Sequence, residues 1–177
     1  GRGRGAGAPE SGGPEDDKPA AAGEPAGAGR DADAGGVVVG VAWGTTMSEV
    51  SAALPSRSVP GLTVVQLNGA STATESGMPY AEAIIARAAK AIGGRIVNFP
   101  VPAFFDYADT KEALWRERSV QSVLNTIDSA DVALFGVGSM SARLPSHVYS
   151  GGFLDPNEIA AAQNDGVVGD VCTVLIR

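Results

Sequence analysis

The chain has 177 residues, with 20 acidic and 13 basic side chains, one His, one Cys and a formal net charge of −7. No apolar run approaches the roughly 18–20 residues that a membrane-spanning helix needs, and the N-terminus lacks the apolar core of a secretory signal. A single Cys and a single His exclude an internal disulfide and a Cys/His zinc site, and the acidic balance argues against nucleic-acid binding by residues 37–177. These features predict a cytoplasmic protein without membrane contact, metal or cofactor.

Residues 1–36 differ in composition from the rest of the chain. They contain eleven Gly, nine Ala, four Pro and eleven charged residues, and no aromatic or branched aliphatic side chain. Such a segment buries too little apolar surface to offset the entropy lost on ordering its backbone. We therefore predict a disordered tail over residues 1–36 and one domain over residues 37–177.

From Val37 onward, β-branched runs alternate with amphipathic stretches, which is the pattern of an α/β fold with a mostly parallel sheet. Residues 37–43 form an apolar run without alternation, typical of a central parallel strand, and a short helix ending before Pro55 follows. Residues 62–67 predict a second strand. A helix is predicted from Pro79 to Ile92, because its apolar residues recur at helical spacing and two glycines follow it.

The second half of the chain repeats this alternation. Residues 95–99 predict a third strand with an extended, proline-containing exit, and the spacing of Asp109 and Glu112 indicates a capping box that opens a helix near Thr110. A second apolar stripe, from Val120 to Ile127, belongs either to the same helix or to a separate one. The remaining predicted elements are a strand over 132–138, a loop over 139–152, a helix from Pro156 and a last strand over 170–176.

Ligands of open parallel α/β sheets bind outside the carboxyl ends of the strands. After the first strand come Gly44, Thr45 and Thr46, where hydroxyls and the free amides of a helix start suit an anion such as phosphate. The other predicted ligand-facing turns are the strand exits Asn68-Gly69, Pro102-Ala103 and Gly136-Val137-Gly138-Ser139, and the Gly169-Asp170 turn that enters the last strand.

Each of these signals also has a purely structural interpretation. Gly44-Thr45-Thr46 could be a plain helix cap, Gly136-Val137-Gly138 a tight turn, and Asp170 a turn cap. His147 is expected on the surface, and Cys172 is expected as a small apolar residue buried within a strand. Trp43 and Trp115 are expected to anchor the core or an interface. No G-x-G-x-x-G motif opens a helix, and no Walker A lysine pattern is present.

Five segments in order resemble the sugar-binding domain of SorC-type transcriptional regulators, relatives of the deoxyribonucleoside-operon and central-glycolytic-gene repressors. The segments are VGVAWGTT at 39–46, VVQLNG at 64–69, PVPA at 100–103, DVALFGVGS at 131–139 and GVVGDVC at 166–172. The resemblance implies a Rossmann-like three-layer sandwich, similar to glucosamine-6-phosphate deaminases and ribose-5-phosphate isomerases. It also implies a phosphorylated sugar as effector.

The resemblance implies roles for particular residues. Gly44, Thr45 and Thr46 match the turn that contacts phosphate, and Asn68 and Gly69 match the exit loop of the second strand. Two glycines, Gly136 and Gly138, match the floor of the pocket, and Asp170 matches the acidic position that holds sugar hydroxyls. No catalytic residue is implied.

Two departures from the family pattern bear on function. Members carry an N-terminal helix-turn-helix, which this chain does not contain, so DNA contact is expected only through such a segment. Members also continue beyond the strand at Asp170, so residues 37–177 are predicted to be a partial effector domain from a homo-oligomeric regulator. An isomerase- or deaminase-like enzyme acting on sugar phosphates is the alternative, with Asp106, Asp109 and Asp170 as the carboxylates near strand exits. A third possibility is a truncated chain that binds nothing.

Overall fold

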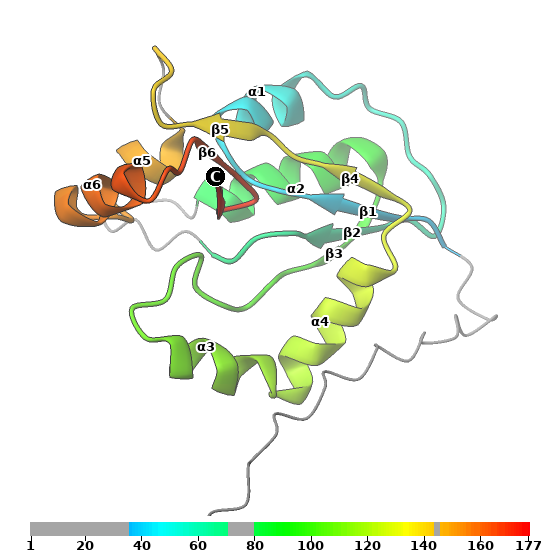
Figure 1. Cartoon of the computed structure of the whole chain (residues 1–177). Coiled ribbons are helices and arrows are strands. Elements are labelled where there is room, and N and C mark those ends of the chain that lie inside the picture. Colours follow the sequence, from blue (N-terminus) through cyan, green and yellow to red (C-terminus); the bar gives the residue numbers. More distant parts are fainter. Residues whose placement is uncertain (1–35, 71–79, 144–145) are drawn as a thin grey trace, which may run out of the picture.

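The computed structural model describes residues 36–70, 80–143 and 146–177 (Figure 1). The predicted tail, apart from Gly36, lies outside the described residues, as does Pro79.

Four parallel strands form the centre of the structure. They are β1 (Val38–Val41), β2 (Thr63–Gln66), β3 (Arg95–Val97) and β4 (Val132–Leu134), in the order β3-β2-β1-β4. In the register of the two middle strands, Val39 lies opposite Val64 and Val41 opposite Gln66. The run of β-branched residues from Val37 thus forms a central strand with a partner on each side, as predicted.

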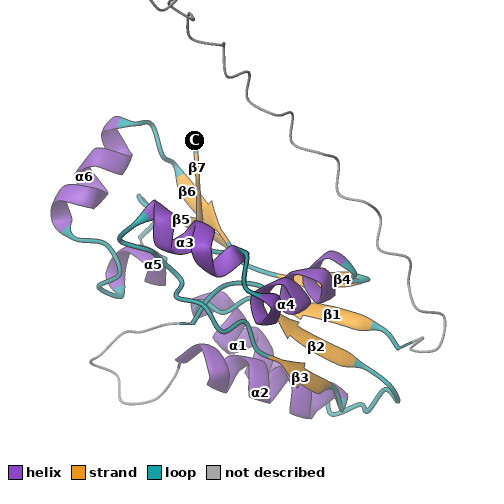
Figure 2. Cartoon of the chain, turned by 90° about the horizontal axis from the view of Figure 1, so that it is seen from below, coloured by secondary structure: helices purple, strands orange, loops and turns teal. Residues whose placement is uncertain are grey.

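Helices cover both faces of this sheet (Figures 1 and 2). Helices α1 (Thr45–Ala53) and α2 (Tyr80–Ile92) pack on one face, where Val41, Val64 and Ile84 belong to one buried cluster. Helices α3 (Ala108–Trp115) and α4 (Arg118–Asp128) lie on the other face, where Val65 packs with Val120. Successive strand residues therefore supply opposite cores, and the predicted α/β three-layer fold is confirmed.

A second, antiparallel sheet stands at the carboxyl ends of the parallel strands (Figure 2). It consists of β5 (Val137–Ser139), β6 (Gly169–Val171) and β7 (Val174–Ile176), accompanied by α5 (His147–Ser150) and α6 (Pro156–Asn164). The predicted strand over 132–138 is therefore wrong as one element, because the chain leaves the first sheet after Leu134 and joins the second at Val137. The predicted loop over 139–152 is also wrong in part, because it contains α5.

The predicted last strand over 170–176 is a hairpin instead. Val171 pairs with Val174, and the two residues between them, Cys172 and Thr173, have φ values of 50° and 66°. Such a pair of positive φ values makes a tight turn whose twist suits two antiparallel strands, although Gly and Asn usually supply it. Cys172 is thus a half-buried turn residue, and the prediction that it lies buried within a strand is wrong.

Helix starts follow the predicted signals in one case and depart from them in another. The Asp155 side chain accepts hydrogen bonds from the amides of Asn157 and Glu158, and the Glu158 side chain accepts one from the Asp155 amide. Together these bonds form the predicted capping box of α6. The capping box predicted at Asp109 is wrong, because α3 begins at Ala108 and its N-cap Tyr107 makes no side-chain cap. The two stripes of residues 108–128 form two helices.

The core on the α2 side should carry much of the stability. Ile84 is fully buried, whereas Ile96 on β3 is 40% exposed, so the two isoleucines form a matched pair. We expect Ile84→Ala to lower the free energy of unfolding by about 2–5 kcal/mol and Ile96→Ala by less than about 1 kcal/mol. Urea unfolding followed by far-UV circular dichroism measures both; equal losses would contradict the described packing.

Candidate ligand-binding cavity

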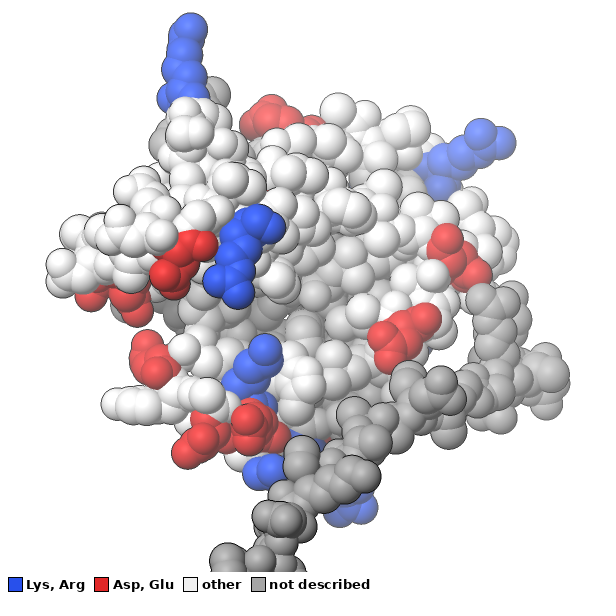
Figure 3. Space-filling model, in the orientation of Figure 1, with Lys and Arg blue, Asp and Glu red and all other residues white. Residues whose placement is uncertain are grey.

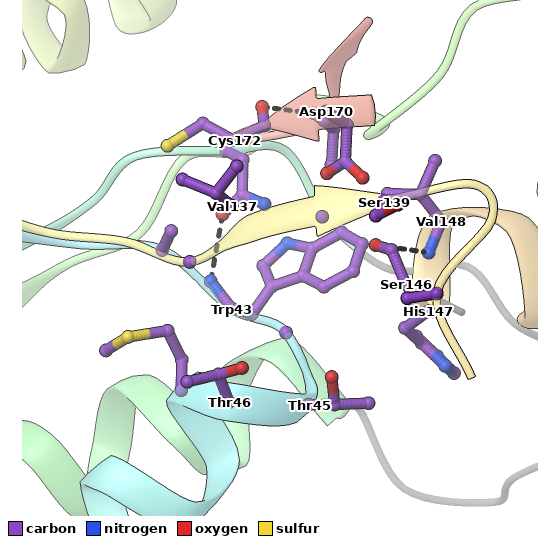
Figure 4. A pocket seen from close by; sticks show the side chains of 18 residues that line it. Trp43, Thr45, Thr46, Val137, Ser139, Ser146, His147, Val148, Asp170 and Cys172 are labelled. Atoms are coloured by element: carbon purple, nitrogen blue, oxygen red, sulfur yellow. Dashed lines mark hydrogen bonds between the residues drawn. The ribbon is translucent and has the colours of Figure 1, made fainter. Parts of the chain in front are cut away.

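A cavity of about 140 Å³ opens between the two sheets. The exits of β1 and β2 and the start of α1 form one side, and β5, β6, the β6–β7 turn and α5 form the other (Figure 4). Its position at the carboxyl ends of parallel strands is where α/β sheets bind ligands.

The start of α1 forms the lower wall of the cavity in Figure 4, where Thr45 and Thr46 are labelled. Gly44 is the N-cap with φ 155°, a conformation that residues with a Cβ rarely adopt. The first helical hydrogen bond of α1 is donated by the amide of Ser48 to the carbonyl of Gly44 at 2.8 Å. The amides of residues 45–47 come before this bond and have no carbonyl of the helix to donate to. They lie at the positive end of the helix dipole, so this wall suits an anion.

Trp43 and Asn68 tie the exits of β1 and β2 together. The backbone amide of Trp43 donates to Asn68 Oδ1 at 3.1 Å, and its indole Nε1 donates to the carbonyl of Gly69 at 2.6 Å. Asn68 is only 3% exposed and lines the cavity. Gly69 lies outside the lining, where it serves as the acceptor for the indole.

Asp170 forms the opposite wall. It is 6% exposed and lies on β6 opposite Gly138, where a Cβ at residue 138 would collide with Asp170 Oδ1. Burial raises the pKa of the Asp170 carboxyl, and the nearby hydroxyls of Ser146 and Tyr149 lower it in part. Asp170 Oδ1 makes no hydrogen bond to the part of the chain that the structure describes. An acceptor of this kind suits a ligand hydroxyl.

Burial raises the pKa of Tyr149 to about 12, with the Asp170 charge as the second cause. The Tyr149 phenol therefore stays protonated at neutral pH and offers a donor beside the carboxylate.

The prediction that His147 lies on the surface is wrong. It is half-buried, lines the cavity and meets the rings of Trp43 and Phe153 edge-on, with centroid separations of 6.3 and 5.7 Å. Burial lowers the pKa of His147, which favours the neutral imidazole at pH 7.

The described structure brings together seven of the eight predicted site residues. They are Gly44, Thr45, Thr46, Asn68, Gly136, Gly138 and Asp170, and Gly69 is the exception. Ser139, which belongs to a predicted strand exit, also lines the cavity, as do Ser146 and His147, which were not predicted as site residues. Ser146 is the N-cap and His147 the first residue of the four-residue helix α5, which is too short to show a periodic pattern in the sequence.

The lining that the structure describes contains no Lys or Arg side chain. Over the face seen in Figure 3, basic and acidic side chains are interspersed and do not gather into a patch of one sign. The described residues hold no cluster of three or more His, Cys, Asp or Glu side chains placed to bind a metal ion. Nor does any described helix have the length and apolarity to cross a membrane.

The fold and the cavity together define the class of protein. It is an α/β domain with a small polar cavity at the carboxyl ends of its parallel strands. The family model Sugar-bind, described as "Putative sugar-binding domain", matches residues 31–176. The chain therefore belongs to this family of sugar-binding domains.

The relatives that the chain resembles include named regulators. It is 30% identical over 138 residues to the deoxyribonucleoside regulator of Bacillus subtilis, covering 78% of this chain and 43% of that regulator. It is 27% identical over 134 residues to the erythritol catabolism regulatory protein EryD of Brucella abortus, covering 76% of this chain and 41% of that protein. The chain thus spans less than half the length of these relatives.

Solved structures show the same fold. A domain of "a possible sugar-binding transcriptional regulator" from Arthrobacter aurescens superposes with a TM-score of 0.71 at 45% identity, covering 80% of this chain and 53% of that one. The sorbitol operon regulator SorC of Klebsiella pneumoniae gives a TM-score of 0.67 at 22% identity, covering 80% of this chain and 46% of that one. The predicted resemblance to SorC-type regulators is thereby confirmed.

The raised pKa of Asp170 predicts a cost to stability at neutral pH. A carboxyl with a raised folded-state pKa binds its proton more tightly when folded, so stability falls as pH rises from about 4 through the folded-state pKa. We expect Asp170→Asn to unfold at a higher temperature than the wild type at pH 7, with the difference shrinking toward pH 4. Thermal unfolding across this pH range measures it.

The matched control is Asp106→Asn, because Asp106 is exposed in the loop before α3. It should leave the pH dependence unchanged. Identical pH dependence of wild type and Asp170→Asn would contradict the described burial of this carboxyl.

Proposed function

We propose that this domain senses a phosphorylated sugar within a regulator of transcription. The observation that carries the proposal is the polarity of the cavity, which places free helix amides on one wall and a buried carboxylate on the other. A phosphate suits the first wall and sugar hydroxyls suit the second. A sugar phosphate has both groups in one small molecule.

The comparisons support this proposal. The family model describes sugar binding, and the relatives are named as a deoxyribonucleoside regulator, an erythritol catabolism regulatory protein and a sorbitol operon regulator. We propose residues 37–177 as the effector part of such a regulator, with DNA contact made by a helix-turn-helix segment of the kind found in the full-length family. Homo-oligomer formation is part of the same proposal.

The enzymatic alternative receives less support. Isomerisation or deamination of a sugar phosphate needs a positioned base. Of the carboxylates considered, Asp106 and Asp109 are exposed and do not line the cavity, whereas Asp170 lines it. The relatives are named as regulators.

Thermal unfolding against a panel of sugar phosphates, the matching free sugars and inorganic phosphate tests the proposal. A ligand that binds only the folded state adds about 2.7 kcal/mol at 100 times its Kd, which raises the melting temperature by several degrees. We expect at least one sugar phosphate to give this shift, and its free sugar and inorganic phosphate to give much smaller ones.

The double variant Thr45→Val/Thr46→Val removes two hydroxyls from the cavity wall and should reduce the shift. Thr110→Val is the control, since Thr110 is exposed on α3. No shift with any sugar phosphate, despite cooperative unfolding of the chain, would contradict the proposal.

A further inference from the structure

Asn68 occupies an unusual place at the edge of the cavity. The last ladder bond between β1 and β2 runs from the Leu67 amide to the Val41 carbonyl at 3.0 Å. Beyond it, the Asn68 side chain replaces the backbone, because Oδ1 accepts the hydrogen bond from the Trp43 amide at 3.1 Å. The side-chain amide of Asn68 is therefore held against Trp43, the residue before Gly44, and so lies beside the start of α1.

The orientation of this amide is fixed by its neighbours. Asn68 Oδ1 must face the Trp43 N–H, because the opposite orientation would set two donors against each other. Behind it, Gln66 is 2% exposed; its Nε2 donates to the Asn68 carbonyl at 2.7 Å and its Oε1 accepts from the Phe99 amide at 3.4 Å. The Asn68 Nδ2 group is left as the donor that these contacts do not use.

Asn68 Nδ2 is buried and makes no hydrogen bond to the described residues. Buried donors are normally satisfied, and one retained at a cavity indicates a ligand acceptor. The same wall holds the first amides of α1, whose dipole favours a negative group, and the described lining has no Lys or Arg to neutralise it. A neutral donor here adds to the helix amides without adding charge.

We propose that Asn68 Nδ2 donates to the phosphate of the ligand, beside the first amides of α1, and thereby sets the preference for a phosphorylated over a free sugar. This inference rests on the proposed function and assigns its phosphate-recognising side chain. Asp170, on the opposite wall, contacts the sugar hydroxyls and does not contribute to that preference.

The test is Asn68→Asp, which keeps an oxygen for the Trp43 amide and turns the donor into a negatively charged acceptor. A hydrogen bond to a charged group typically accounts for at least about a tenfold change in affinity. We expect the Kd for the sugar phosphate that stabilises the wild type to rise by at least about tenfold, and that for the matching free sugar to change by less than about threefold. Isothermal titration calorimetry measures both.

Asn98→Asp is the matched control, because it introduces the same charge at an exposed position after β3. It should leave both affinities unchanged. An Asn68→Asp protein that binds the sugar phosphate as the wild type does, or that loses the free sugar equally, overturns the inference. Absence of sugar-phosphate binding by the wild type would instead overturn the proposed function.

A second measurement covers the case in which Asn68→Asp does not fold. The side-chain amide signals of Asn68 are assigned in a nitrogen-15 NMR spectrum of the wild type and followed during titration. They should shift with the sugar phosphate and with inorganic phosphate, and stay in place with the free sugar. Signals that stay in place with saturating sugar phosphate overturn the inference.

Discussion

The cavity depends on the way in which Trp43 fastens two strand exits together. Its amide and its indole donate to Asn68 Oδ1 and to the Gly69 carbonyl, so one residue of β1's exit holds two consecutive residues of β2's exit. Trp43 is 5% exposed, and the centroid of its ring lies 5.6 Å from that of Phe153, which precedes α6. Without these contacts, neither the start of α1 nor the position of Asn68 would be defined.

The second sheet supplies a buried carboxylate on the other side of the cavity. Because β5 and β6 pair through Gly138 and Asp170, the carboxylate comes close to the backbone of residue 138, and a larger residue there would displace it. Burial at this position opposes ionisation, which raises the pKa of Asp170. The domain therefore keeps a destabilising group at its cavity, as binding sites commonly do.

The sequence was most informative where local rules apply. The uninterrupted apolar run before Gly44 predicted a central parallel strand, and the Gly-Thr-Thr turn after it predicted the helix start that lines the cavity. The exit rule for parallel sheets also selected Asn68, which lines the cavity. Asp170 was selected as part of a turn before a last strand, and it reaches the opposite wall from β6 of the antiparallel sheet.

The parts of the fold that depend on strand pairing between distant residues could not be predicted from the sequence. Nothing in the run from Val132 to Gly138 marks the point where the chain passes from one sheet to another, because both halves are equally apolar. The Cys172-Thr173 turn lacks the Gly or Asn that usually marks such a hairpin. Ser146 and His147 reach the cavity only because α5 packs beside β5, and that contact depends on a fold that local patterns do not encode.

The central claim is that the two walls bind opposite ends of one ligand. The most direct measurement is a crystal structure of the chain with the sugar phosphate that raises its melting temperature. The account predicts phosphate oxygens on the first amides of α1 and on Asn68 Nδ2, with sugar hydroxyls on the Asp170 carboxylate. A ligand bound elsewhere, or one with its phosphate against Asp170, would contradict it.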